Sequence, residues 1–294
     1  MKNLVKLSLT LCLASLSFGA SALTINTINT SAGTGNLLTN ALLAQDSGIT
    51  VVGDTRYRGT NAADLQQSGI YTGFILAPAD GVGPTLTLGD GIVLTTGSAD
   101  VVYNNTRGNF GAGADSGGDD DLAALHGDSV YDANVLTFDF TVGAGVKSVS
   151  AQFVFGSEEF PVQPVTDIFG FFIDGVNYAL FPDGSKISNN GDSSHFIANE
   201  VDTGRYGIEY NGLTRVYTVT GLLDSSLSTH TISIGIADTW DTGYDSGVFI
   251  SSLKAGQGGQ GGIGNEVPEP GTLLLLGLGL AGVAAMQRRR AARG

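Results

Sequence analysis

The chain has 294 residues and a formal net charge of −14, with 28 acidic residues against 14 basic ones. So acidic a surface repels nucleic-acid phosphates and anionic lipid headgroups, which argues against a nucleic-acid partner. One cysteine, Cys12, cannot form an internal disulfide, so stability must come from burial in a core.

The first residues have the pattern of an export signal. A positively charged start precedes an apolar stretch over 7–18, which is too short to span a bilayer. An Ala-x-Ala cleavage site follows at Ala20 and Ala22. We therefore predict a signal peptide over 1–22, whose cleavage removes Cys12 and leaves a mature domain without disulfides.

A single β domain is predicted over 23–255, because no linker-like composition interrupts it before Gly256. One short helix is expected near its start, with Asn36 as the N-cap and Gly48 as the stop. The apolar residues that recur there at helical spacing are Leu37, Leu38, Ala41 and Leu42.

Strand patterns dominate the rest of the domain. Apolar residues alternate with polar ones over 136–142, 149–155 and 232–236, which is the period of half-buried strands. Gly, Asp and Asn separate most of these segments, and this spacing predicts an all-β, jelly-roll-like β-sandwich. The other strand candidates are 49–54, 69–76, 91–96, 167–173, 215–220 and 248–253.

Two segments are predicted to lack regular structure. The stretch 104–121 is rich in Gly, Asn and Asp and is expected to be a long exposed loop, either mobile or ligand-binding. Its Asp-Ser-Gly-Gly sequence at Ser116 does not indicate a serine protease, because the first histidine is His126. The glycine-rich stretch 256–266 is expected to be a flexible spacer.

Acidic residues recur at the predicted strand ends and could converge at one rim of the sandwich. Six to eight oxygen ligands are what Ca²⁺ requires, whereas no His/Cys set for zinc is present. We therefore predict one Ca²⁺ site, with the alternative that these acids cap turns. The predicted ligands are Glu158, Glu159, Asp167, Asp238 and Asp245.

Aromatic residues near these acids offer a second kind of site. Trp240, Tyr244 and Tyr103 are the candidates for stacking on a sugar ring. A glycoside hydrolase is less favoured, because adjacent residues such as Glu158 and Glu159 would point to opposite faces of a strand. We expect no catalytic residue.

The last segment, 267–294, has the order of elements of a sorting signal. The triplet Pro268-Glu269-Pro270 precedes an uncharged apolar run over 271–286, and these 16 residues are short for a permanent span. A terminal arginine cluster follows, namely Arg288, Arg289 and Arg290.

This arrangement resembles the PEP-CTERM sorting signal, and the alternative is an ordinary membrane tail. The resemblance implies a C-terminal hydrophobic helix that engages the inner membrane transiently, cleavage by an exosortase of a Gram-negative bacterium, and release to the cell surface or exterior, often with exopolysaccharide. Loss of residues 1–22 and of the tail after Pro270 leaves 8 basic residues against 28 acidic ones, a net charge of −20.

The exported region resembles the choice-of-anchor L domain. The motifs that carry the resemblance are the Leu/Ala-rich helix, 155–161 (FGSEEFP), 167–175 (DIFGFFIDG), 237–238 and 244–250 (YDSGVFI). It implies a surface protein with no assigned activity. The function expected is that of a non-enzymatic surface or extracellular matrix protein that binds Ca²⁺ and acts in adhesion or in an exopolysaccharide matrix, with a carbohydrate-binding module as the alternative. Signal peptidase and exosortase are the partners expected during export.

Overall fold

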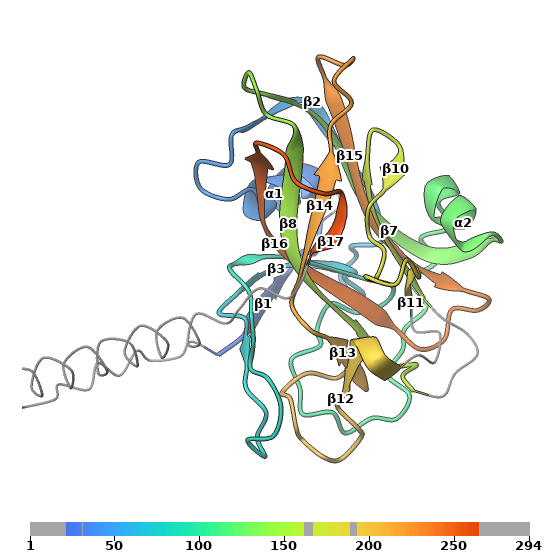
Figure 1. Cartoon of the computed structure of the whole chain (residues 1–294). Helices are drawn as coiled ribbons and strands as arrows, with labels where there is room; N and C mark the ends of the chain where they lie inside the picture. Colours follow the sequence, from blue (N-terminus) through green and yellow to red (C-terminus); the bar gives the residue numbers. More distant parts are fainter. Residues whose placement is uncertain (1–21, 31, 162–166, 189–192, 265–294) are drawn as a thin grey trace, which may run out of the picture.

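The computed structural model describes residues 22–30, 32–161, 167–188 and 193–264, and the structural statements below refer to these residues. Two antiparallel sheets pack face to face and contain most of the described strands (Figure 1). The all-β sandwich predicted from the alternating pattern is confirmed.

The larger sheet contains nine strands within the described residues. They are β1 (Thr24–Thr27), β3 (Ser68–Thr72), β6 (Gly91–Thr95), β8 (Ser148–Ser157), β12 (Phe196–Ala198), β13 (Gly212–Thr214), β14 (Tyr217–Leu222), β16 (Ser246–Gly256) and β17 (Gly262–Gly264). The strand β8 is central: one edge pairs with β16, and the other pairs with β14 and then with β13.

The smaller sheet contains six strands by the same count, in the order β10-β9-β15-β7-β2 with β11 also on β9. They are β2 (Ile49–Arg58), β7 (Val130–Val142), β9 (Ile168–Ile173), β10 (Val176–Asn177), β11 (Ile187–Ser188) and β15 (His230–Thr239). The strand β15 lies between β7 and β9, so that Ile234 is opposite both Leu136 and Phe171.

The main core lies between the two sheets and is rich in phenylalanine. Phe138 and Phe140 on β7 face a core that also holds Phe153 and Phe155 of β8, and the rings of Phe153 and Phe169 lie 5.2 Å apart. Burial of each such side chain contributes about 1.5–3 kcal/mol.

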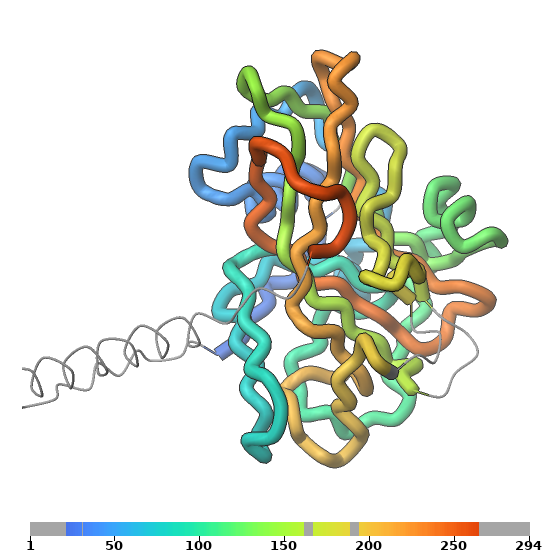
Figure 2. The backbone as a smooth tube through the Cα atoms, viewed as in Figure 1, coloured from blue at the N-terminus to red at the C-terminus, as the bar shows by residue number. Residues whose placement is uncertain are grey.

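Each sheet also buries part of its outer face. Outside the larger sheet, Val154 and Phe249 pack with side chains from the loops and from the hairpin of β4 (Ile75–Leu76) and β5 (Leu86–Thr87). This hairpin and the 200–211 loop extend to the same end of the molecule, where the Ala79 amide donates to the Arg205 carbonyl at 2.7 Å (Figure 2). Because some strands are buried on both faces, positions that would face solvent in a one-sided strand often carry apolar side chains.

The helix α1 (Thr34–Leu42) confirms the helical spacing but not its predicted ends. Gly33 is the N-cap, with φ of 75°, and no side chain caps the helix there. Asn36 therefore lies inside the helix. Gly48, with φ of 70°, lies beyond the end of the helix, just before β2.

A second helix, α2 (Asp120–His126), occupies the end of the stretch expected to be an open loop. The Asp119 carboxylate caps it by accepting from the amides of Asp121 and Leu122, at 3.1 and 3.2 Å. The prediction of a single helix was therefore wrong. The run of aspartates forms the N-cap and first turn of α2, where negative charge interacts favourably with the helix dipole. A short 3₁₀ helix, η1, spans Ser193–His195.

Two further predictions differ from the structure. The strand expected over 69–76 is divided between β3 and β4, because Gly73, with φ of 67°, turns the chain. The spacer expected over 256–266 is in part a strand, since β17 pairs with β14 in the larger sheet. The described part of this glycine-rich segment is therefore attached to the domain.

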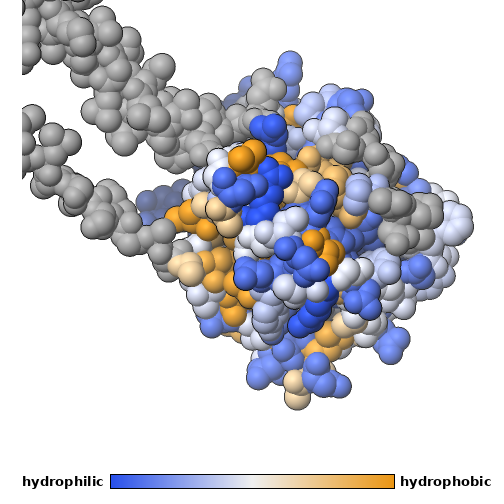
Figure 3. All heavy atoms as spheres, turned by 90° about the horizontal axis from the view of Figure 1, so that it is seen from below, coloured by the Kyte–Doolittle hydropathy of each residue, from blue (hydrophilic) through white to orange (hydrophobic). Residues whose placement is uncertain are grey.

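The surface seen from below is a mosaic in which hydrophilic side chains surround smaller hydrophobic patches (Figure 3). Such a distribution is ordinary for a folded domain. By itself it does not indicate a docking face.

The contact that holds α2 on the smaller sheet is Leu122, which is fully buried. It packs over Gly170 and Gly235, which are direct partners on β9 and β15. A Cβ on either glycine would lie 3.1 Å from a methyl group of Leu122, and the neighbouring Phe172 and Val135 would lie closer still, so the glycines leave room for all three side chains.

We predict that Leu122→Ala lowers the free energy of unfolding by about 2–5 kcal/mol, because it leaves a cavity over the two glycines. Urea denaturation measures this. The matched control is Leu37→Ala on α1, where the side chain is 46% exposed and the loss should be much smaller. Equal losses in the two variants would contradict the packing described.

Candidate functional site

The five acidic residues predicted as ligands are all buried where strands of the two sheets end. Glu158 and Glu159 lie in the turn after β8, and Asp245 directly precedes β16, the neighbour of β8. Asp167 directly precedes β9, and Asp238 lies on β15, next to a register shift. Their exposed fractions are between 0 and 3%. We call these residues the acidic cluster.

Asp167 and Asp238 have the least compensated charges of the cluster. None of their four carboxylate oxygens has a hydrogen-bond partner within the described chain. Burial raises the pKa of each well above its ordinary range, and the Asp238 charge adds to this effect on Asp167. The hydroxyls of Ser246 and Thr96 lie near these carboxylates without forming a hydrogen bond of normal geometry to them, and they offset only part of the increase.

Glu159 joins the turn after β8 to the start of β9. Its Oε2 accepts from the Asp167 amide at 3.1 Å, and its own amide donates to the Ser157 hydroxyl at 3.1 Å. Burial raises the pKa of Glu159 to about 8, despite the hydrogen bond from the Asp167 amide.

Asp245 holds two parts of the segment between β6 and α2 in place. Its Oδ2 accepts from the Ser98 amide at 3.1 Å, and its Oδ1 accepts from the Ala112 amide at 3.0 Å. Burial raises the pKa of Asp245 to about 7, although both hydrogen bonds favour the charged form. Part of the loop expected to be exposed is therefore packed over the acidic cluster.

Glu158 points toward a different set of groups from Glu159. Its Oε1 accepts from the Phe110 amide at 3.4 Å, and burial, with a contribution from the charge of Glu209, raises its pKa to about 8. Glu209 is itself fully buried, and Arg107 Nε lies 3.8 Å from its Oε1. Sequence reasoning missed Glu209, which no motif marked.

Tyr210 is a second residue that the sequence did not identify. Its ring lies against two glycines: a Cβ on Gly156 would lie 2.5 Å from the ring, and one on Gly247 would lie 2.2 Å from the hydroxyl. The hydroxyl has no hydrogen-bond partner among the described residues. Burial raises its pKa well above the ordinary value, with further increases from the charges of Asp245, Asp167 and Glu158. Both glycines belong to the sequence motifs quoted above, and the need to admit the ring of Tyr210 gives a physical reason for glycine at these two positions.

The acidic cluster carries the kind of oxygen donors that a hard cation prefers, but these donors do not form a cation site as they stand. Within the described ranges, no three carboxylate, imidazole or thiolate side chains form a group that could hold a metal ion as they stand. Carboxylate oxygens are nevertheless the ligands that Ca²⁺ prefers, and those of Asp167 and Asp238 have no competing partner.

The aromatic candidates do not form one site. Trp240 is 70% exposed with φ of 72°, Tyr103 is 41% exposed, and Tyr244 is partly buried. A pocket of about 210 Å³ includes Tyr103 but neither of the other two. Its lining residues are Ser98, Asp100, Tyr103, Arg107, Asn109, Phe110, Gly111 and Ala112.

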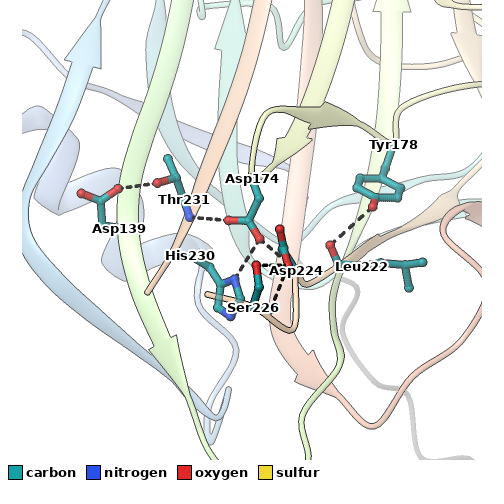
Figure 4. Close-up of polar contacts among 8 residues, drawn as sticks. All are labelled: Asp139, Asp174, Tyr178, Leu222, Asp224, Ser226, His230 and Thr231. Carbon is teal, nitrogen blue, oxygen red and sulfur yellow. Dashed lines mark hydrogen bonds and ion pairs between the residues drawn. The ribbon is translucent and has the colours of Figure 1, made fainter. Parts of the chain in front are cut away.

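The hydroxyls and histidines that suggest nucleophilic catalysis have structural partners. The Ser116 hydroxyl donates to the Ala133 carbonyl at 2.9 Å. His230 Nδ1 lies 2.8 Å from the carboxylate of Asp174, whereas the Ser226 hydroxyl donates to Asp224 at 2.7 Å (Figure 4). The His230–Asp174 contact connects the start of β15 to the turn after β9, and the Asp224 amide donates to the same Asp174 carboxylate at 3.1 Å, which ties the loop before β15 to that turn.

The sorting elements lie largely outside the described residues. These include Ala20 of the cleavage site, the Pro268-Glu269-Pro270 triplet and the arginine cluster; Ala22 is described and exposed. Of the helices that the structure describes, none is long and apolar enough to cross a bilayer.

Comparison with known families accounts for most of the chain. The model of the choice-of-anchor L domain matches residues 24–254, and that of the PEP-CTERM protein-sorting motif matches residues 266–290. Both resemblances drawn from the sequence are thereby confirmed. Neither the curated proteins nor the solved structures contain a significant match.

We predict that the cation-free domain becomes less stable as the pH rises from about 4 to 8. The pKa of Glu159 is raised to about 8 by burial, so the folded chain binds more protons than the unfolded chain throughout this window. The free energy of unfolding should fall by an amount on the order of a few kcal/mol. Thermal melts in chelator across the pH range measure it.

Glu159→Gln should flatten this pH profile and raise stability at pH 8, because it removes a buried carboxylate that must otherwise ionise. The control is Glu200→Gln, at an exposed position. A melting temperature that rises between pH 5 and 8 in chelator would contradict the burial argument.

Proposed function

The chain belongs to the choice-of-anchor L family, and on that premise we propose that it is a non-enzymatic structural protein of the cell surface or extracellular matrix that binds Ca²⁺. The family match and the PEP-CTERM motif together make it an exported, exosortase-sorted surface protein of Gram-negative bacteria. The calcium, adhesion and matrix roles are the proposed part.

The observation that carries the calcium proposal is the set of four unpartnered oxygens on Asp167 and Asp238. Buried carboxylates without donors are costly when ionised, and a divalent cation removes that cost more completely than a hydroxyl does. In addition to burial, the charge of Glu159 raises the pKa of Asp167, and the charges of Asp245 and Asp132 raise that of Asp238. Rotation of Glu159 toward Asp167 and Asp238 would add its carboxylate oxygens to theirs, while Asp245 remains on the amides of Ser98 and Ala112.

Burial also favours a structural role over a hydrolytic one. Glu158 and Glu159 are 3 and 2% exposed, so neither carboxyl group can reach a glycosidic bond of a polymer at the surface. The matched families are surface-anchoring and sorting families rather than enzyme families.

A carbohydrate-binding role is the second candidate function. The pocket that contains Tyr103 favours it, because an exposed aromatic ring there lies among hydrogen-bonding side chains. Exopolysaccharide is the proposed ligand class.

We predict that millimolar Ca²⁺ raises the melting temperature at pH 8 by about 5–10 °C. This is the shift expected for a ligand at roughly a hundred times its Kd in a domain of this size. Differential scanning calorimetry with Ca²⁺, Mg²⁺ or chelator measures it, and Mg²⁺ should have the smaller effect.

Asp238→Asn should abolish the Ca²⁺ response while leaving the domain folded in chelator, because the amide keeps the shape of the carboxylate without its charge. The matched control is Asp64→Asn, at an exposed position outside the cluster. Identical melting temperatures for the unmodified chain with Ca²⁺ and with chelator would overturn the calcium proposal.

A further inference from the structure

The pocket that contains Tyr103 has an arginine whose orientation is fixed by its neighbours. The guanidinium carbon of Arg107 lies 5.4 Å from the ring centroid of Tyr103 and 5.7 Å from that of Phe110. Its Nε faces the buried Glu209 at 3.8 Å. Stacking on two rings and attraction to one carboxylate restrict the plane of the guanidinium.

The outer nitrogens of Arg107 remain available. The side chain is 54% exposed, and its contact with Glu209 is made through Nε rather than through the terminal nitrogens. A planar guanidinium with two free, parallel N–H groups is the group that binds a carboxylate through two hydrogen bonds.

The rest of the lining is polar and suits hydroxyl groups. Asp100 accepts from the Tyr103 hydroxyl at 2.5 Å, and Ser98 and Asn109 complete the polar side chains of the pocket. Such groups can donate to or accept from the hydroxyls of a sugar ring. A volume of about 210 Å³ holds one ring-sized unit rather than an extended chain.

The buried acids hold this pocket in shape. Two of its backbone amides, those of Ser98 and Ala112, donate to Asp245, and that of Phe110 donates to Glu158. The loop therefore presents Arg107 on a support already ordered before a ligand arrives, which reduces the entropic cost of binding.

We propose that this pocket binds a carboxylated sugar unit, with the carboxylate on the terminal nitrogens of Arg107 and the ring hydroxyls facing Asp100, Asn109 and Ser98. The proposal rests on the carbohydrate-binding role given above as the second candidate function, and it names the ligand class. It does not depend on the calcium proposal.

A matched pair of disaccharides tests it: cellobiouronic acid, in which one glucose of cellobiose carries a carboxylate, and cellobiose itself. Titration calorimetry on the purified chain should show at least tenfold tighter binding of the acid. Arg107→Gln should remove this preference. Arg107→Lys should retain only part of it, because an ammonium lacks the planar pair of donors.

The control variant is Arg56→Gln, because Arg56 is an equally exposed arginine that pairs with Asp139 on the smaller sheet. It should leave the preference unchanged. The melting temperature of Arg107→Gln in chelator should match that of the unmodified chain, which reports that the variant is folded independently of any Ca²⁺ response.

Equal affinity for the two disaccharides, unchanged in Arg107→Gln, would overturn the carboxylate inference and leave the carbohydrate-binding role standing. Absence of binding of either disaccharide would overturn both. Binding of acetate as tightly as the uronic acid would overturn the role of the sugar ring.

Discussion

A carboxylate removed from water loses hydration that only a proton, a set of hydrogen-bond donors or a cation can replace. The acidic cluster places five such groups where strands of the two sheets end, and burial raises the pKa of every one. Asp245 and Glu158 are compensated by loop amides, whereas Asp167 and Asp238 lack donors. The stability of this end of the sandwich therefore depends on what neutralises that pair.

The same constraint organises the surrounding structure. Because Asp245 accepts from the amides of Ser98 and Ala112, the long segment between β6 and α2 lies on the cluster instead of extending into solvent. Tyr210 reaches the cluster only because Gly156 and Gly247 have no side chains to exclude its ring. The pocket around Arg107 lies on this packed loop, so a ligand there and a cation below would act through one ordered segment.

Export determines the pH and the cation concentration to which these acids are exposed. An exosortase-sorted protein functions outside the cytoplasm, where proton and cation concentrations are set by the surroundings of the cell. A cluster that is stable when protonated, and unstable when ionised without a cation, would make the domain respond to both quantities. A large negative net charge repels polyanions at a distance, so recognition of an acidic sugar requires a local group such as Arg107.

The sequence by itself determined the sandwich, most of its strands, the C-terminal sorting motif, and the strand-end positions of the five acids. These follow from local patterns: period-two alternation, an apolar run of fixed length, and the placement of Asp and Glu beside glycine-rich turns. It could not determine that α2 docks over Gly170 and Gly235, that β17 joins the larger sheet, or that Glu209 and Tyr210 lie beside the acids. Those facts depend on contacts between residues far apart in the chain, where complementary shape and shared desolvation decide the outcome and local periodicity carries no information.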